Sequence, residues 1–146
     1  MVRGSNPRAG TTLTLLTQAS GWVIAALTAV TVTLPFLLRS RLRWAGPYLA
    51  RLQPHYWIGF TIAGLSLIHA GLAMSSGPIP SSVSWSVGIW IATGAMLLVF
   101  PQVSLGMGLR RPGGADRKRR RRLHLLTMVV LLGAGAAHLV LNGGPL

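Results

Sequence analysis

Four long apolar stretches alternate with short polar or basic segments along this chain. The stretches cover residues 13–38, 54–74, 83–107 and 123–141. About twenty predominantly apolar residues are needed for an α-helix to cross the hydrocarbon core of a bilayer, and each stretch is of that length. The pattern predicts an all-α membrane protein with a single domain over residues 1–146, an up-down-up-down bundle of four transmembrane helices.

The ends of the stretches carry further signals. The first is too long for the apolar region of a signal peptide, and no convincing small-residue cleavage site follows it, so we expect a retained helix. Pro54 suits the first turn of the second helix, where its missing N–H is not needed. Pro35 predicts either a kink in the last turn of the first helix or the point where that helix ends. Pro101 predicts a kink in the third helix.

Composition restricts the chemistry that the chain can perform. It is 51% hydrophobic and 10% charged, whereas soluble domains are about 25% charged. There is no cysteine, and Asp116 is the single acidic residue. Disulfides, iron–sulfur clusters and cysteine-ligated zinc are therefore excluded, as are a catalytic pair of carboxylates and a Ser–His–Asp arrangement.

The basic residues predict how the bundle is oriented. Residues 39–51 hold four and residues 110–122 hold eight of the fourteen Lys and Arg residues. The positive-inside rule places both segments in the cytoplasm and both termini outside, in a multi-pass protein of the cell (inner) membrane. Because the run at 117–122 joins two membrane helices, we favour contact with anionic membrane lipid over nucleic-acid binding. Docking of an acidic redox partner there stays open.

The four histidines lie in the second and fourth stretches and repeat one spacing. His55 and His69 are fourteen residues apart, and so are His124 and His138. Fourteen residues are two heptads and rise about 21 Å along a helix. With the predicted topology these two helices run parallel, so His55 lies level with His124, and His69 with His138. A single histidine could simply bond a neighbouring helix, but intramembrane ionisable residues are usually functional.

Two facing imidazoles predict a particular kind of metal site. Iron suits imidazole, and two axial imidazoles fill the positions that a porphyrin leaves free. Zinc would need two further ligands at each pair, and the sequence offers none. We therefore expect two b-type haems, with all four histidines as axial ligands.

Neighbouring residues complete this expectation. Arg51 lies one turn before His55, and Arg120 and Arg121 lie one turn before His124; their cations would hold the propionates of the inner haem. Ser66, one turn before His69, is a candidate partner for the second ring nitrogen of that histidine. Small residues also recur near the histidines, and five of them are glycines: Gly59, Gly64, Gly71, Gly133 and Gly135. Clearance for haem and close helix packing are both open explanations for these glycines.

The histidine motifs resemble those of a known group. LQPHYWIG…LIHAG and RRLHLL…AAHLVL each have a basic or polar lead-in, a histidine, small residues and a second histidine. They resemble the di-haem membrane cytochrome b group, particularly the ferric-reductase-like transmembrane domain, over the second to fourth helices. The resemblance implies His55 and His124 on an inner haem, and His69 and His138 on an outer one.

Two features depart from the ferric-reductase-like pattern. That family often has one residue fewer between its second pair of histidines, whereas fourteen in both pairs is closer to the respiratory cytochrome b pattern. The sequence also has no cytoplasmic flavin and nicotinamide domain, so a reductase activity does not follow.

The expected function is transmembrane electron transfer, from a cytoplasmic flavoprotein or a membrane quinol to an acceptor at the outer face. The chain would work with a redox partner protein or quinone, or as a subunit of a larger oxidoreductase; whether it is itself an enzyme stays open. One alternative is a non-catalytic membrane anchor or assembly subunit of a larger respiratory or redox complex. A proton or metal transporter is disfavoured, because intramembrane acids are missing.

Overall fold

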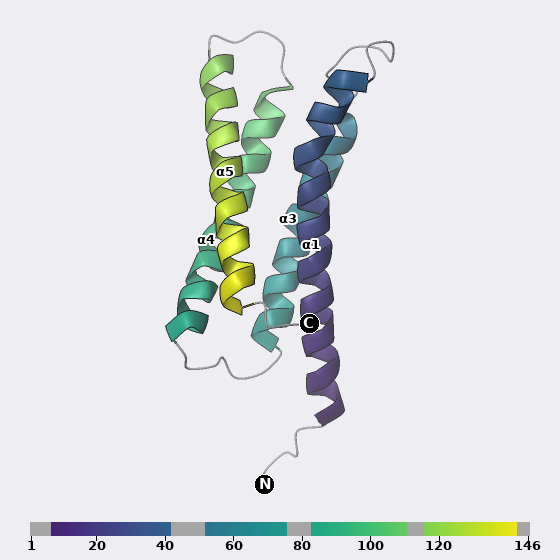
Figure 1. Ribbon diagram of the computed structural model, residues 1–146, viewed down its shortest axis with the longest axis vertical. Coiled ribbons are helices and arrows are strands. Elements are labelled where there is room, and N and C mark those ends of the chain that lie inside the picture. The colour runs from purple at the N-terminus through teal and green to yellow at the C-terminus, as the bar shows by residue number, and fades with distance from the viewer. Residues whose placement is uncertain (1–6, 42–51, 76–82, 111–115, 143–146) are drawn as a thin grey trace.

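Four long helices make up the part of the chain that the computed structural model describes, which is residues 7–41, 52–75, 83–110 and 116–142. The helices are α1 (Pro7–Arg41), α3 (Gln53–Ser75), α4 (Val83–Gly108) and α5 (Arg117–Asn142) (Figure 1). No strand occurs within those residues. The prediction of an all-α, four-helix bundle is confirmed.

The helices run up, down, up and down, so α3 and α5 point in the same direction (Figure 1). α1 packs against α3, α4 packs against α5, and α3 and α4 join the two pairs. The bundle therefore consists of two antiparallel hairpins, α1–α3 and α4–α5, that lie side by side. This arrangement places the two histidine-bearing helices in different hairpins.

The surface of the bundle is apolar. All four helices are long and apolar enough to cross a membrane, over Gly10–Leu38, Gln53–Ser75, Ser86–Gly108 and Arg117–Asn142. Large hydrophobic side chains point outward, including Trp90 and Val140, which are 76% and 82% exposed. Such a surface needs lipid around it. The chain is a multi-pass membrane protein.

Two helices are longer than the hydropathy pattern predicted. α3 and α4 match their predicted bounds within one residue, whereas α1 extends in both directions and α5 begins at Arg117. The run Arg117–Arg122, expected in a linker, is therefore the beginning of α5, which is a correction. Arg and Lys are good helix formers, so their charge does not end a helix.

The two prolines inside helices do not end them. α1 continues past Pro35 to Arg41, and α4 continues past Pro101 to Gly108. Pro35 is therefore not the end of the first helix. Membrane helices tolerate proline because local adjustments and neighbouring hydroxyls satisfy the freed carbonyl.

Hydroxyl groups within the helices are satisfied mainly by their own helix. On α1, Thr17, Thr28 and Thr31 each donate to the carbonyl oxygen four residues back, at 2.8–2.9 Å. This back-bonding lets polar side chains lie in an apolar environment. Thr127 of α5 also donates to the side-chain oxygen of Gln102 on α4, and this bond ties the second hairpin together.

Candidate functional site: two layers of paired histidines

The four histidines form two pairs between α3 and α5. The ring centroids of His55 and His124 are 6.4 Å apart with their planes at 73°. Those of His69 and His138 are 6.3 Å apart with their planes at 89°. The structure thus brings together the two pairs that the fourteen-residue spacing predicted. The pairs form two layers, separated by about 21 Å along the helices.

These separations match those expected of two imidazoles bound on opposite sides of one metal ion. A metal–nitrogen distance of about 2.0–2.1 Å, added to a ring radius of about 1.1 Å on each side, places two such centroids roughly 6.3 Å apart. Rotation of either ring about its metal–nitrogen bond leaves that separation unchanged. The large angles between the ring planes are therefore compatible with shared ligation.

α1 orients both imidazoles of α3. The Nδ1 atom of His55 lies 2.9 Å from the carbonyl oxygen of Thr31, which can only accept a hydrogen bond. The Nδ1 atom of His69 lies 3.0 Å from Ser20 Oγ. Since the Ser20 hydroxyl donates its own hydrogen to the Thr17 carbonyl at 2.9 Å, it accepts from His69. In their neutral forms both rings therefore carry the proton on Nδ1 and a lone pair on Nε2.

α4 contacts the imidazoles of α5 in a similar way. The Nδ1 atom of His138 donates to the carbonyl oxygen of Gly88 at 3.3 Å. The Nδ1 atom of His124 is buried and forms no hydrogen bond of standard geometry with the described chain, although the main chain of Gln102 lies beside it. Three of the four histidines thus have Nδ1 engaged with the neighbouring helix of their own hairpin, which leaves Nε2 for a ligand.

Two glycines of α4 allow α5 to approach. Gly88 and Gly106 are buried and eighteen residues apart, which is five helical turns, so both lie on one face of α4. A Cβ at Gly106 would lie 3.4 Å from His124 Cε1, and one at Gly88 would overlap the side-chain amide of Asn142. Each histidine of α5 therefore has a glycine of α4 at its level.

Gly21 of α1 is the counterpart on the other hairpin. A Cβ there would lie 3.2 Å from His69 Cε1. The sequence reasoning missed Ser20, Gly21, Gly88 and Gly106, which all lie on the helices without histidine. The five-turn spacing of Gly88 and Gly106 is the signal that would have found these two glycines. No comparable spacing marks Ser20 or Gly21 in the sequence.

The glycines that the sequence did single out have a different environment. A Cβ added at each would meet no atom of the neighbouring helices within 4 Å. The described helices therefore do not pack closely at these positions. Gly64, Gly71 and Gly133 are exposed, and Gly59 and Gly135 are half-buried. Clearance for haem stays a prediction for the glycines nearest the histidines. The five positions are Gly59, Gly64, Gly71, Gly133 and Gly135.

The other predicted site residues lie in varied places. Arg51 falls outside the described residues. Arg121 is exposed, and the guanidinium of Arg120 packs against Gly108 of α4. Ser66 donates its hydroxyl hydrogen to Ile62 O at 2.8 Å. The prediction that it partners His69 is wrong, since Ser20 takes that place.

Among the described residues, each layer supplies two imidazoles and no third histidine, cysteine or carboxylate. No cluster of three or more His, Cys, Asp or Glu side chains occurs in the four described segments. Comparison with family models, characterised proteins and solved structures finds no match to this chain. The resemblance noted above therefore depends on the histidine motifs alone.

Proposed function

We propose that this protein is a membrane cytochrome that carries electrons across the bilayer through two b-type haems, one in each histidine layer. The observation that supports this most directly is the pairing of His55 with His124 and of His69 with His138 at the separation of two imidazoles on one metal. The contacts of α1 and α4 with Nδ1 add to it, because they leave Nε2 free for iron in three of the four rings.

The donor set fits haem better than a bare metal ion. Two imidazoles would leave zinc two ligands short of its usual four. Haem iron already carries four porphyrin nitrogens and needs only two axial ligands. When bound, haem would supply one-electron chemistry, and the two imidazoles of each layer would hold it.

The space beside the histidines supports the same choice. Gly59 follows His55 by four residues, and Gly135 precedes His138 by three, so each glycine lies close to the histidine's face of its helix. A methyl group added at either glycine would have no atom of a neighbouring helix within 4 Å. No hydrophobic side chain of the described residues is buried, so the helices do not close on an apolar core of their own.

The surrounding residues would tune and anchor the groups. By accepting the Nδ1 proton, Ser20 and the Thr31 carbonyl fix the tautomer of the α3 histidines and make the rings more basic ligands. At the level of His138, the side-chain amide of Asn142 is buried and has no hydrogen-bond partner among the described residues. That amide can donate to a haem carboxylate. At the other layer Arg51 and Arg121 stay the proposed cations. Arg120, the third cation predicted there, has its guanidinium against Gly108 and lines a pocket that no histidine lines.

The basic segments set the proposed direction. With residues 39–51 and 110–122 in the cytoplasm, the His55–His124 layer lies on the cytoplasmic side of an inner membrane. Electrons would enter there from a flavoprotein or a membrane quinol. They would pass to the His69–His138 layer about 21 Å away and then to an acceptor at the outer face.

A reduced-minus-oxidised visible spectrum of the purified protein, with haem counted per chain, tests the proposal. We expect sharp low-spin b-type bands and two haems per chain. A variant with both His55→Ala and His69→Ala lacks one ligand of each pair and provides the baseline. A colourless wild-type protein from cells supplied with haem would reject the proposal and favour a non-catalytic membrane anchor.

A further inference from the structure

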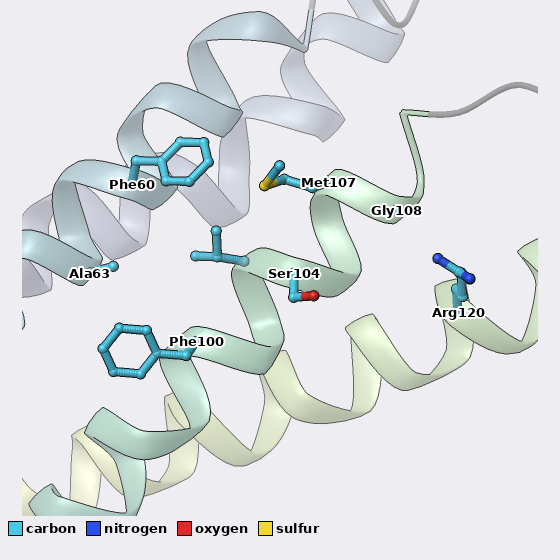
Figure 2. Close-up of a pocket in the computed structure, with 8 residues that line it drawn as sticks. Phe60, Ala63, Phe100, Ser104, Met107, Gly108 and Arg120 are labelled. Carbon is cyan, nitrogen blue, oxygen red and sulfur yellow. The ribbon is translucent and has the colours of Figure 1, made fainter.

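A second site lies in the groove between α3 and α4, near the end of the bundle where α5 begins. The groove holds a pocket of about 610 Å³ (Figure 2), a volume within the range of ligand-binding sites. Its apolar wall comes from Phe60 and Ala63 of α3 and from Phe100 and Val103 of α4. Ser104 of α4 and Arg120 of α5 supply polar groups.

This pocket is separate from the histidine layers, since no histidine lines it. Phe60 follows His55 by five residues and lies about 140° round the helix from it. Ser104 precedes Gly106 by two residues and lies about 160° from the face that meets His124. Phe60 and Phe100 are 42% and 47% exposed. The pocket therefore belongs to the surface of the bundle that faces lipid.

The pocket is apolar at one end and cationic at the other (Figure 2). The Arg120 guanidinium is packed against Gly108, where an added Cβ would lie 2.5 Å from Nη1. A second cation lies near this end of the pocket. The Arg110 guanidinium is 5.0 Å from the centre of the ring of Tyr56, which is one turn before Phe60 on α3. The N-terminus of α5 adds the positive end of its helix dipole.

The chain can neutralise little of its positive charge itself. It has fourteen Lys and Arg residues and one acidic residue, Asp116, so most of the counter-charge must come from other molecules. Basic sites between transmembrane helices commonly bind anionic lipid headgroups. A small soluble anion would leave the apolar wall unused, and a neutral quinone would leave the guanidinium without a counter-charge.

We propose that this pocket is a binding site for one anionic phospholipid. An acyl chain lies against Phe60, Ala63, Phe100 and Val103, and the phosphate accepts hydrogen bonds from the Arg120 guanidinium and the Ser104 hydroxyl. The bound lipid bridges the two hairpins on the outside of the bundle, because its contacts come from α3 on one side and from α4 and α5 on the other.

Native mass spectrometry of the purified, delipidated protein tests this site, with phosphatidylglycerol and phosphatidylcholine added in equal amounts. We expect one phosphatidylglycerol per chain to survive at collision energies that remove phosphatidylcholine. Arg120→Gln should lower its retention on the order of tenfold, since a charge-assisted hydrogen bond to phosphate is lost. Arg119→Gln removes the same charge from outside the pocket and should change retention less than about twofold, because exposed charges are screened.

Ala63→Leu tests the apolar wall without changing the charge. It should lower phosphatidylglycerol retention while the protein keeps its helix content by circular dichroism. Equal losses in Arg120→Gln and Arg119→Gln, equal retention of the two lipids, full retention in Ala63→Leu, or a bound quinone mass would each overturn the proposal. Haem appears as a separate mass in the same spectra, so this result is independent of the proposed electron-transfer function.

Discussion

The Nδ1 atom of His69 on α3 lies 3.0 Å from the hydroxyl oxygen of Ser20 on α1. That hydroxyl also donates to the Thr17 carbonyl at 2.9 Å, so it both belongs to its own helix and accepts from the neighbouring one. A hydroxyl in an apolar helix usually satisfies its own backbone alone. Ser20 therefore acts as a positioning residue for the ring that faces His138.

Replacing Ser20 by alanine should change one haem and leave the other unaltered. Loss of the acceptor makes His69 a less basic ligand and so disfavours ferric iron. We expect the potential of the haem at His69 and His138 to rise by roughly 20–60 mV, the equivalent of one hydrogen bond. Potentiometric titration followed in the visible spectrum would resolve this shift.

Thr14→Ala is the matched control for that change. It removes another α1 hydroxyl, which among the described residues bonds to the Gly10 carbonyl of its own helix, and it should leave both potentials unchanged. Equal shifts in the two variants, or a shift of both haems in Ser20→Ala, would contradict the assignment of Ser20 to the His69 ring.

Single alanine substitutions of the four histidines should fall into two classes. His69→Ala and His138→Ala should each lose one haem, and His55→Ala and His124→Ala should each lose the other, because each iron needs both rings of its layer. Pyridine haemochrome analysis gives the haem content, and the surviving spectral band identifies the layer. Unchanged haem content in any one variant would break the pairing.

Filling the space beside a histidine should exclude haem without unfolding the helices. Gly135 lies three residues before His138, and Gly94 lies about 120° round α4 from the face of Gly88. Neither has a neighbour within 4 Å of an added Cβ. We expect Gly135→Leu to lower haem content by about half and Gly94→Leu to leave it unchanged, with helix content by circular dichroism preserved in both. Similar haem contents in the two variants would show that the space near Gly135 faces lipid.

The orientation of the bundle can be tested with single cysteines, because the chain has none of its own. Gln53 and Ser75 are exposed residues at opposite ends of α3. The positive-inside rule predicts that Ser75→Cys reacts with a membrane-impermeant maleimide in intact cells, whereas Gln53→Cys reacts only after the membrane is opened. The reverse pattern would invert the proposed direction of electron flow.

Hydropathy and histidine spacing predict the helices and the pairing for physical reasons. The length of an apolar run is set by the thickness of the membrane, so the bounds of α3 and α4 follow closely from it. The fourteen-residue spacing keeps two side chains of one helix near the same face. Once α3 and α5 are parallel, the pairing of His55 with His124 follows. The start of α5 was misplaced because Arg117 is charged but still favours a helix.

The contacts around the rings could not be predicted in the same way. Ser20 and Ser66 look alike in sequence, since both are isolated serines in apolar helices, but only the packing of α1 on α3 decides which of them reaches His69. The contact of His55 with the Thr31 carbonyl involves no side chain of Thr31 at all. Every residue has a main-chain carbonyl, so residue type does not indicate which carbonyl accepts a hydrogen bond. This contact can be identified only once the fold is known.

The division of the bundle into hairpins also bears on how the protein would assemble. α1 holds the rings of α3, and α4 holds the His138 ring of α5, so each hairpin carries half of both sites. Each iron would be bound by one histidine from each hairpin and would therefore link the two hairpins. If the chain binds haem as proposed, incorporation of haem and linking of the two hairpins through the metal would then be a single event.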